Sequence, residues 1–340
     1  ITMAPDIGIR GPVMTSDNTR IADPAPQTFA GDSPGQTAKR LFNATRPKFF
    51  PASVLPVLAG SAWGFHAAGG FDFIVFALAL FATVCVHAAS NVLNDVGDDS
   101  GGTDPQNEDR IYPYTGGSRF IQQGIMSQEE MARWGITLLA LAAIAGIGLI
   151  FLKGAMVLYL GLAGVALGVL YSLGPVLLAS LGIGETAVAF VFGVVPIVGA
   201  AWLQGAAINM QLVLFSLPVS AWVCAILLIN EVPDIAADGA TGKRTLPVRL
   251  GLNATSIVYL FLHVAAATIT GWLAFSGALP LAAPVVPVAL LVIAIKSSLA
   301  IRHGIEDRPG MTRAIEGTLA IHTIGSLWLA GCLLYLHWWG

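Results

Sequence analysis

The fold of this chain follows from Asn91-Val-Leu-Asn94-Asp95-Val-Gly-Asp98-Asp99-Ser-Gly-Gly-Thr-Asp104, a polar stretch that ends an apolar run over residues 71–90. On a helix, Asn91, Asp95 and Asp98 fall at i, i+4 and i+7 and share one face. Carboxylates crowded at the end of an apolar helix repel one another unless a cation lies between them. The stretch therefore predicts a long apolar helix that ends in a cation-binding cluster.

The composition is that of a membrane protein. Of the 340 residues, 55% are hydrophobic and only 11% are charged, whereas soluble domains carry about 25% charged residues. The mean hydropathy is +0.74. Runs of about 20 apolar residues can cross a bilayer, and nine of them predict an all-α integral membrane fold, a transmembrane bundle around a central cavity. The runs are at about 49–69, 71–94, 131–152, 154–173, 184–204, 210–232, 253–276, 280–301 and 315–338.

The basic residues predict the orientation in the membrane, which is the inner membrane if the cell is bacterial. They gather before the first span and in the long links after the second, sixth and eighth spans, and only Lys153 of the 17 falls on the opposite side. Because basic residues favour the cytoplasmic side, we expect the amino terminus and the long links in the cytoplasm and the carboxy terminus outside. The Pro-, Gly- and Ser-rich residues 1–38 predict a disordered tail, and residues 39–340 form the membrane domain. We expect no nucleic acid partner.

A second acidic cluster closes the sixth span, over residues 230–245. In each cluster an Asn is followed four residues later by an Asp, at Asn94 and Asp98 and again at Asn230 and Asp234. A Thr-Gly element that contains basic residues comes after each cluster. These elements are 115–119 and 241–244. The match predicts an internal pseudo-repeat, with acidic helix ends that face each other across the cavity.

The residue types in both clusters suit a magnesium site. Carboxylate and amide oxygens are hard ligands, and Mg²⁺ usually binds a substrate phosphate as well. With Lys and Arg nearby, the clusters predict a site that holds Mg²⁺ and a diphosphate and stabilises a departing pyrophosphate, beside an apolar cavity that shelters a lipid chain and a carbocation from water. The predicted metal ligands are Asn94, Asp95, Asp98, Asp104, Asn230, Asp234 and Asp238. The predicted catalytic residues are Asp98, Asp234, Asp238, Lys243 and Arg119.

Several residues near the clusters have two interpretations. Arg46 and Lys48 could bind the diphosphate or anchor the first span at anionic headgroups. Tyr171 could steer the leaving group or the acceptor, or lie in the interfacial aromatic belt. Glu185 could lie near the acceptor or favour the helix dipole, and His87 could reach the site or make a packed polar contact. The predicted substrate-binding residues are Asn91, Arg46, Lys48, Arg119, Tyr171, Lys243 and Arg244.

Two other interpretations of the acidic clusters are possible. The acids could be solvated loop residues, but two clusters at matched spacing, each at the end of a span and followed by cations, argue against this. The chain could also be a secondary transporter or an Mg²⁺ channel with repeated half-bundles. In that class the acids lie near the membrane midplane, whereas here they lie at helix ends on one side. The pattern therefore favours an enzyme.

The paired clusters resemble the signature of the UbiA superfamily of intramembrane aromatic prenyltransferases, and the resemblance covers roughly residues 39–338. It implies an all-helical fold with nine transmembrane helices, Mg²⁺ dependence, a polyprenyl diphosphate donor and an aromatic acceptor. By position, the first aspartate-rich motif of that family is matched by Asn94, Asp98 and Asp104, and the second by Asp234 and Asp238.

Several stretches are most similar to the branch of this superfamily that prenylates 1,4-dihydroxy-2-naphthoate in menaquinone synthesis. They are residues 44–60, the six-residue step from Asp98 to Asp104, residues 171–175 with 182–185, Gln204 and residues 242–251. The branch implies transfer of the polyprenyl group to that naphthoate with loss of its carboxylate. Residues 116–124 depart from the commoner form of their loop, so the alternative is another acceptor: a different quinone precursor, haem, chlorophyllide or a glycerol-phosphate lipid.

Overall fold

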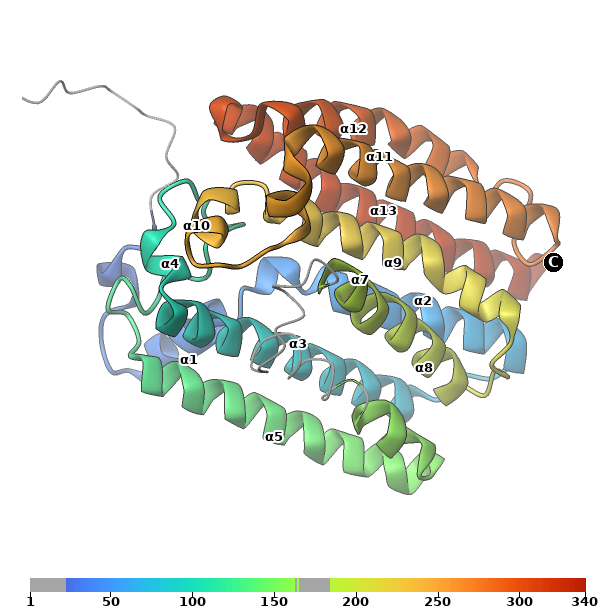
Figure 1. Ribbon diagram of the computed structural model, residues 1–340. Coiled ribbons are helices and arrows are strands. Elements are labelled where there is room, and N and C mark those ends of the chain that lie inside the picture. Colours follow the sequence, from blue (N-terminus) through green and yellow to red (C-terminus); the bar gives the residue numbers. More distant parts are fainter. Residues whose placement is uncertain (1–22, 163, 165–183) are drawn as a thin grey trace, which may run out of the picture.

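Long helices run side by side in the structure, a computed structural model that describes residues 23–162, 164 and 184–340 (Figure 1). The described ranges contain no strand. The helices are η1 (Pro26–Phe29), α1 (Pro34–Ala44), η2 (Pro47–Phe49), α2 (Pro51–Ala68), α3 (Phe73–Gly101), α4 (Thr103–Gln106), α5 (Gln128–Lys153), α7 (Gly184–Ala189), η4 (Phe190–Val194), α8 (Val195–Leu203), α9 (Met210–Asn230), α10 (Ile235–Ala240), α11 (Leu246–Phe275), α12 (Val285–His303), η5 (Gly304–Asp307) and α13 (Arg308–Trp339). Among these described residues, six helical segments are long and apolar enough to cross a membrane, and one of the six contains both α12 and α13.

Eight of the nine expected spans correspond to helices in the described part of the chain. The other one, 154–173, falls largely outside the described residues. The helices are longer than the apolar runs: α3 continues to Gly101 rather than ending near residue 94, and α11 and α13 begin before the expected starts at 253 and 315. An apolar run in the sequence marks only the apolar part of a helix, so it does not include polar turns at the ends of the same helix. The part of the first acidic cluster from Asn91 to Asp99 consequently lies on regular helix, whereas Asp104 lies on α4.

The folded chain begins earlier than residue 39, so the predicted boundary of the disordered tail is too late. Both η1 and the start of α1 lie within the predicted tail. The Nη1 atom of Arg40 donates a hydrogen bond to the carbonyl oxygen of Phe29 at 3.0 Å. Asp23 accepts one from Nη2 of Arg110 at 2.6 Å, which ties this segment to the loop after α4. Residues 1–22 of the predicted tail lie outside the described residues.

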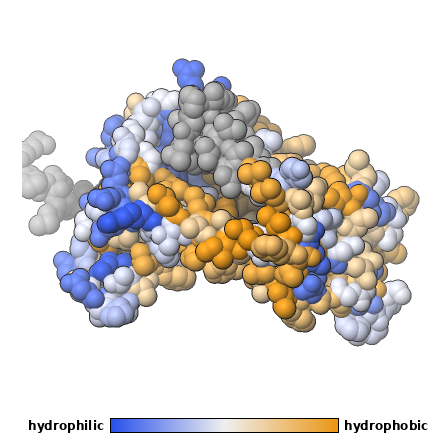
Figure 2. Space-filling view, turned by 90° about the horizontal axis from the view of Figure 1, so that it is seen from below, coloured by the Kyte–Doolittle hydropathy of each residue, from blue (hydrophilic) through white to orange (hydrophobic). Residues whose placement is uncertain are grey.

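The helices form two main apolar cores. One core lies between α2, α9, α11, α12 and α13, and the other lies between α3, α5 and the loop that follows α4. Hydrophilic residues gather at one end of the molecule and hydrophobic residues cover much of its middle (Figure 2). That hydrophilic end carries α4 and α10 (Figure 1). The packing therefore places the polar segments of both halves of the chain at the same end of the bundle.

A glycine allows α2 to approach α8 closely. A Cβ atom at Gly60 would lie 2.2 Å from the carbonyl oxygen of Ile197, which belongs to the backbone and cannot move aside cheaply. Because overpacking costs about 1–3 kcal/mol, we expect Gly60→Ala to lower the melting temperature in detergent by several degrees. The control is Gly146→Ala on α5, where a Cβ atom meets nothing within 4 Å. Equal melting temperatures for the two variants would contradict the close contact.

Candidate active site

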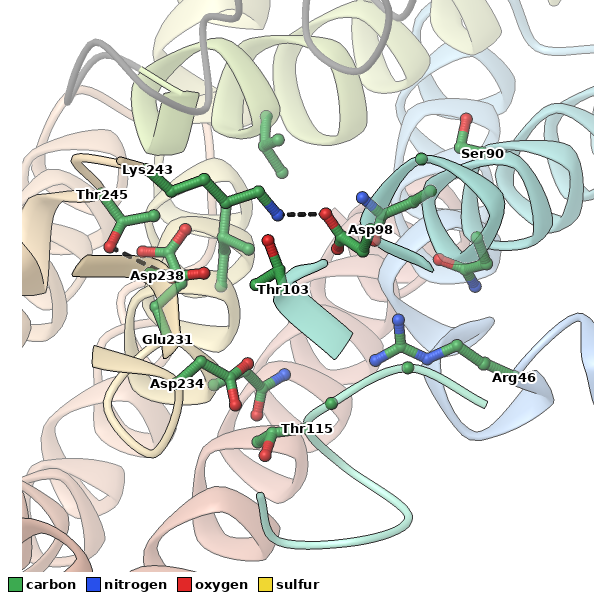
Figure 3. A pocket seen from close by; sticks show the side chains of 18 of the residues that line it. Arg46, Ser90, Asp98, Thr103, Thr115, Glu231, Asp234, Asp238, Lys243 and Thr245 are labelled. Atoms are coloured by element: carbon green, nitrogen blue, oxygen red, sulfur yellow. Dashed lines mark hydrogen bonds and ion pairs between the residues drawn. The ribbon is translucent and has the colours of Figure 1, made fainter. Parts of the chain in front are cut away.

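A pocket of about 470 Å³ lies between α3, α9 and the short helices α4 and α10 (Figure 3). One part of its wall consists of carboxylates, amides, hydroxyls and a lysine, and another part consists of apolar side chains. The apolar part includes Val188, Val191, Phe192, Val223 and Ile226. A charged region and an apolar region therefore belong to one continuous pocket.

The last turns of α3 present Asn91, Asn94 and Asp98 to the pocket. The sequence predicts that Asn91, Asp95 and Asp98 share one face, whereas in the structure Asn94 lines the pocket in place of Asp95. Asp95 does not line the pocket; 3% of its side chain is exposed, and it accepts a hydrogen bond from the backbone N–H of Ser118 at 2.9 Å. The structure therefore places Asp95 behind the pocket wall next to Asp104, where it holds the loop after α4.

Asp104, on α4, lines the pocket beside α3. The loop that follows α4 folds back over it: Gly117 has a φ of +74°, and a Cβ atom there would lie 2.5 Å from Oδ2 of Asp104. Nη1 of Arg119 donates a hydrogen bond to the backbone carbonyl oxygen of Asp104 at 2.5 Å. Burial raises the pKa of the Asp104 carboxyl to about 8, and the nearby charges of Asp95 and Asp98 add to this effect.

The second cluster faces the first across the pocket (Figure 3). Oδ1 of Asp234 accepts a hydrogen bond from Nδ2 of Asn107 at 2.7 Å, and Oδ2 of Asp238 accepts one from Oγ1 of Thr245 at 3.5 Å. Burial raises the pKa of Asp234, and it raises the pKa of Asp238 to about 7, because a carboxylate loses hydration when it is removed from water. Asn230, at the end of α9, also lines the pocket.

Two contacts connect the clusters directly. The ammonium group of Lys243 forms an ion pair with Oδ1 of Asp98, and the hydroxyls of Thr103 and Thr241 lie 3.0 Å apart in a hydrogen bond. Burial lowers the pKa of Lys243, but the charges of Asp98 and Asp238 outweigh it and raise that pKa overall. The lysine is therefore a fixed positive charge between two acidic clusters.

The predicted substrate-binding residues divide into two groups. Asn91, Arg46 and Lys243 line the pocket, whereas Arg119, Lys48 and Arg244 do not line it among the described residues. Arg119 has a φ of +66°, and its buried guanidinium contacts the back of α4. Lys48 and Arg244 are exposed, and Nζ of Lys48 lies 5.1 Å from the ring centroid of Tyr114. Tyr171 falls outside the described residues.

Glu231 is a pocket residue that the sequence did not single out. It directly follows α9, it is buried, and its Oε2 has no hydrogen-bond partner among the described residues. Burial and the adjacent Glu185 raise the pKa of Glu231 well above its usual value. Oε1 of Glu185 in turn accepts a hydrogen bond from the backbone N–H of Leu246 at 2.6 Å, so Glu185 holds the start of α11 beside the pocket. The sequence signal that could have identified Glu231 is an acidic residue directly after a long apolar run. Further pocket residues without a predicted role are Thr103, Asn107, Thr241 and Thr245.

The oxygen atoms of the pocket fit Mg²⁺ that is bound together with an anionic substrate. Among the described residues, no three side chains of His, Cys, Asp or Glu come close enough to hold a metal ion by themselves. Three buried oxygens of predicted ligands have no hydrogen-bond partner within the described chain: Oδ1 of Asp95, Oδ2 of Asp104 and Oδ1 of Asn230. Mg²⁺ keeps several waters and takes a few carboxylate ligands plus substrate phosphates. An open set of oxygen donors with unpartnered members suits that mode of binding.

We expect Mg²⁺ to bind more tightly as the pH rises. The pKa values of about 8 for Asp104 and about 7 for Asp238 mean that both carboxyls carry protons near neutral pH, and the metal must displace those protons. The apparent Kd should fall about tenfold or more between roughly pH 6 and pH 9 and then level off. Calorimetry in buffers of different ionisation enthalpy measures both the Kd and the protons released. A Kd that does not change with pH, without proton release, would contradict the prediction.

The fold and the pocket together define an all-helical membrane protein with a carboxylate- and lysine-lined site that opens onto an apolar cavity. The chain belongs to the UbiA prenyltransferase family, because the sequence model of that family matches residues 53–309. It is therefore a prenyltransferase and an integral membrane protein.

Curated relatives and solved structures agree with this assignment. The 1,4-dihydroxy-2-naphthoate octaprenyltransferase of Haemophilus influenzae is 31% identical over 255 residues, which cover 67% of this chain and 78% of that protein. The protein of the same name from Escherichia coli K12 is 32% identical over 212 residues, which cover 61% of this chain and 67% of that protein. The structure of a UbiA homologue from Archaeoglobus fulgidus bound to GPP and Mg²⁺ matches with a TM-score of 0.60 and 16% identity, and it covers 87% of this chain and 99% of that chain. At this identity the structural likeness shows the fold.

Proposed function

We propose that this prenyltransferase transfers a polyprenyl group from an allylic diphosphate to 1,4-dihydroxy-2-naphthoate in menaquinone synthesis. The observation that carries the proposal is the pocket, in which two carboxylate clusters and Lys243 adjoin an apolar wall. The charged part suits a diphosphate with Mg²⁺, and the apolar part suits a polyprenyl chain. The relatives from H. influenzae and E. coli are both named 1,4-dihydroxy-2-naphthoate octaprenyltransferase, which supports naphthoate as the acceptor.

The first task of the site is to hold the diphosphate. When bound, Mg²⁺ supplies electrostatic stabilisation of the charge that develops on the departing group. The residues that would hold it are Asn94, Asp98, Asp104, Asn230, Asp234 and Asp238. Lys243 pairs with Asp98 and can exchange this carboxylate for a phosphate oxygen. Nη2 of Arg46 donates to the carbonyl oxygen of Tyr114 at 3.2 Å, which fixes a second cation at the pocket wall, so the charge on pyrophosphate meets preorganised partners.

The second task is to protect the reacting carbon. Transfer breaks the bond between the first prenyl carbon and the diphosphate oxygen, and it forms a bond from that carbon to the aromatic ring. Water in the pocket would capture a carbocation, so apolar side chains such as Val191, Phe192 and Ile226 act by excluding it. For naphthoate, the carboxylate leaves as CO₂ and its electron pair stays with the ring.

We further propose nine spans, an internal pseudo-repeat and a cytoplasmic location for the amino terminus and the pocket loops, with the carboxy terminus outside. Eight helices of the described chain at expected positions support the number of spans. The two acidic clusters across the pocket support the repeat. The one-sided distribution of the basic residues supports the orientation.

The test is an assay of purified protein with Mg²⁺, allylic diphosphates of several chain lengths and a panel of acceptors, with the products identified by mass. We expect prenylated, decarboxylated naphthoate and equimolar pyrophosphate, and no product after chelation of Mg²⁺. A product from a different aromatic acceptor would reassign the acceptor. No product with any aromatic acceptor would contradict the proposed function.

A further inference from the structure

His87 forms part of the pocket wall at a distance from the acidic clusters. It lies on α3 one turn before Asn91, about 6 Å along the helix axis. Only 6% of the residue is exposed. Its ring packs against Phe50 and Phe192, with ring centroids 5.7 Å and 5.0 Å away. The structure therefore places a polar ring among the aromatic and apolar side chains of the pocket.

The hydrogen bonds of Ser53 assign the tautomer of this imidazole. Oγ of Ser53 lies 2.9 Å from Nδ1 of His87, and the same hydroxyl donates a hydrogen bond to the carbonyl oxygen of Phe50 at 3.1 Å. A hydroxyl has one hydrogen to donate. We assign that hydrogen to Phe50, so that Nδ1 carries the ring proton and donates it to Ser53. Nε2 is then the unprotonated nitrogen, with a free lone pair.

Nε2 lacks a protein partner. In the described part of the chain, the ring makes its hydrogen bond through Nδ1 alone, and its other neighbours are the rings of Phe50 and Phe192. Because His87 lines the pocket, a bound substrate can reach this nitrogen. A polyprenyl chain has no hydrogen to donate, whereas a hydroxylated aromatic ring does. The geometry therefore identifies the partner by its chemistry as a phenolic hydroxyl.

We infer that Nε2 of His87 binds a ring hydroxyl of the aromatic acceptor and takes its proton as the new carbon–carbon bond forms. The inference rests on the proposed function and assigns a catalytic base to it. Withdrawal of the hydroxyl proton pushes electron density into the ring and makes the adjacent carbon a better nucleophile. The pocket wall along α3 runs from His87 past Asn91 and Asn94 to Asp98, and the inference places the acceptor ring between the base and the diphosphate-binding end.

The reaction balances for a hydroxynaphthoate. The hydroxyl proton moves to Nε2 as the ring carbon that bears the carboxylate attacks the prenyl carbon, and pyrophosphate leaves with the electron pair of the broken C–O bond. The ring oxygen is then a ketone, and the carboxylate lies β to it. Loss of CO₂ places its electron pair on that oxygen through the enolate, which takes the proton back from Nε2. His87 is thereby regenerated.

Two substitutions test this role. In His87→Asn the amide nitrogen can still donate to Ser53, but no atom replaces Nε2, and we expect kcat for naphthoate prenylation to fall by about 10²–10⁴-fold. His87→Gln places an amide oxygen near the position of Nε2, so it can accept the hydrogen bond without taking the proton; we expect a KM for naphthoate close to that of the wild type and a low kcat. In both variants the Kd of a short allylic diphosphate with Mg²⁺ should stay within about threefold.

His303→Asn is the matched control, because this histidine is exposed at the end of α12 and its variant should retain wild-type activity. A kcat for His87→Asn within about threefold of the wild type would overturn the inference. Equal losses of kcat and of diphosphate affinity would also overturn it, by indicating a structural role. If His87→Asn does not fold, His87→Gln carries the same comparison. If the wild-type protein forms no prenylated naphthoate, the proposed function itself is wrong, which is a distinct result.

Discussion

Asp98→Asn and Asp234→Asn are each expected to lower kcat of prenyl transfer by about 10³-fold, the loss typical of removing one preorganised electrostatic group from a reacting centre. The two side chains come from opposite sides of the pocket, one on α3 and one directly before α10. Each substitution removes a negative charge without changing the shape of the side chain. A neutral amide is a weak ligand for Mg²⁺, so the charge on the departing diphosphate loses part of its stabilisation.

The fold should survive both substitutions. Asn107 donates to Oδ1 of Asp234, and an amide oxygen at the same position accepts that hydrogen bond equally well. At position 98 the ion pair with Lys243 becomes a hydrogen bond. We therefore expect melting temperatures within a few degrees of the wild type, and a higher concentration of Mg²⁺ needed for half-maximal activity. The measurement is initial rate against Mg²⁺ concentration for each variant.

Asp99→Asn is the matched control for these variants. It makes the same change of charge one residue away on the same helix, but the Asp99 carboxylate accepts a hydrogen bond from Nε2 of Gln122 at 3.0 Å and does not line the pocket. Its activity should stay within about threefold of the wild type. Similar losses of activity in Asp98→Asn and Asp99→Asn would show that activity depends on the total charge of the helix and not on a metal site. That result would contradict the assignment of Asp98 as a metal ligand.

Residue spacing predicted the acidic clusters well but could not tell which acids face the pocket. Asn94 and Asp98 line it, as their four-residue spacing indicates. Asp95 is adjacent to Asn94, and adjacent residues are about 100° apart around a helix, so both cannot point to the centre of one pocket. The sequence shows a helix with many acids, but the direction of the cavity depends on how α3 packs against α5 and the loop after α4.

Residues whose placement depends on loop conformation were the hardest to predict. Arg119 follows two glycines with φ of +74° and has a positive φ itself, which folds the loop back and turns the guanidinium toward the backbone of α4. A basic residue that follows an acidic cluster in the sequence suggests a contact with substrate. The number of residues between Arg119 and the cluster, however, does not show that the loop folds back and turns this side chain away from the pocket. Glu231 was missed because the sequence does not show its burial. It directly follows α9, and only the packing of α7 beside α9 shows that it is buried.

Gly117→Ala is expected to lower activity by about 10²-fold and to weaken Mg²⁺ binding, because position 117 touches the first cluster. A Cβ atom there would lie 2.5 Å from Oδ2 of Asp104 and 3.0 Å from Oδ1 of Asp95. One carboxylate lines the pocket and the other anchors the loop, so a methyl group must displace either a predicted metal ligand or the loop itself. A shift of about 1 Å near reacting groups can cost about 10²-fold in rate.

Gly124→Ala separates this clash from backbone strain. Gly124 lies in the same loop with a φ of +64°, and a Cβ atom there meets nothing within 4 Å. Both substitutions place a side chain in the left-handed region, at a cost of about 1–2 kcal/mol, so both should lower the melting temperature, and Gly117→Ala should lower it further because of its clash. Activity at saturating Mg²⁺, measured below both melting temperatures, should fall strongly for Gly117→Ala and by no more than about threefold for Gly124→Ala. Equal activities would mean that the loop does not hold Asp104 in place, and that the polar wall of the pocket is set by α3, α4 and α10 alone.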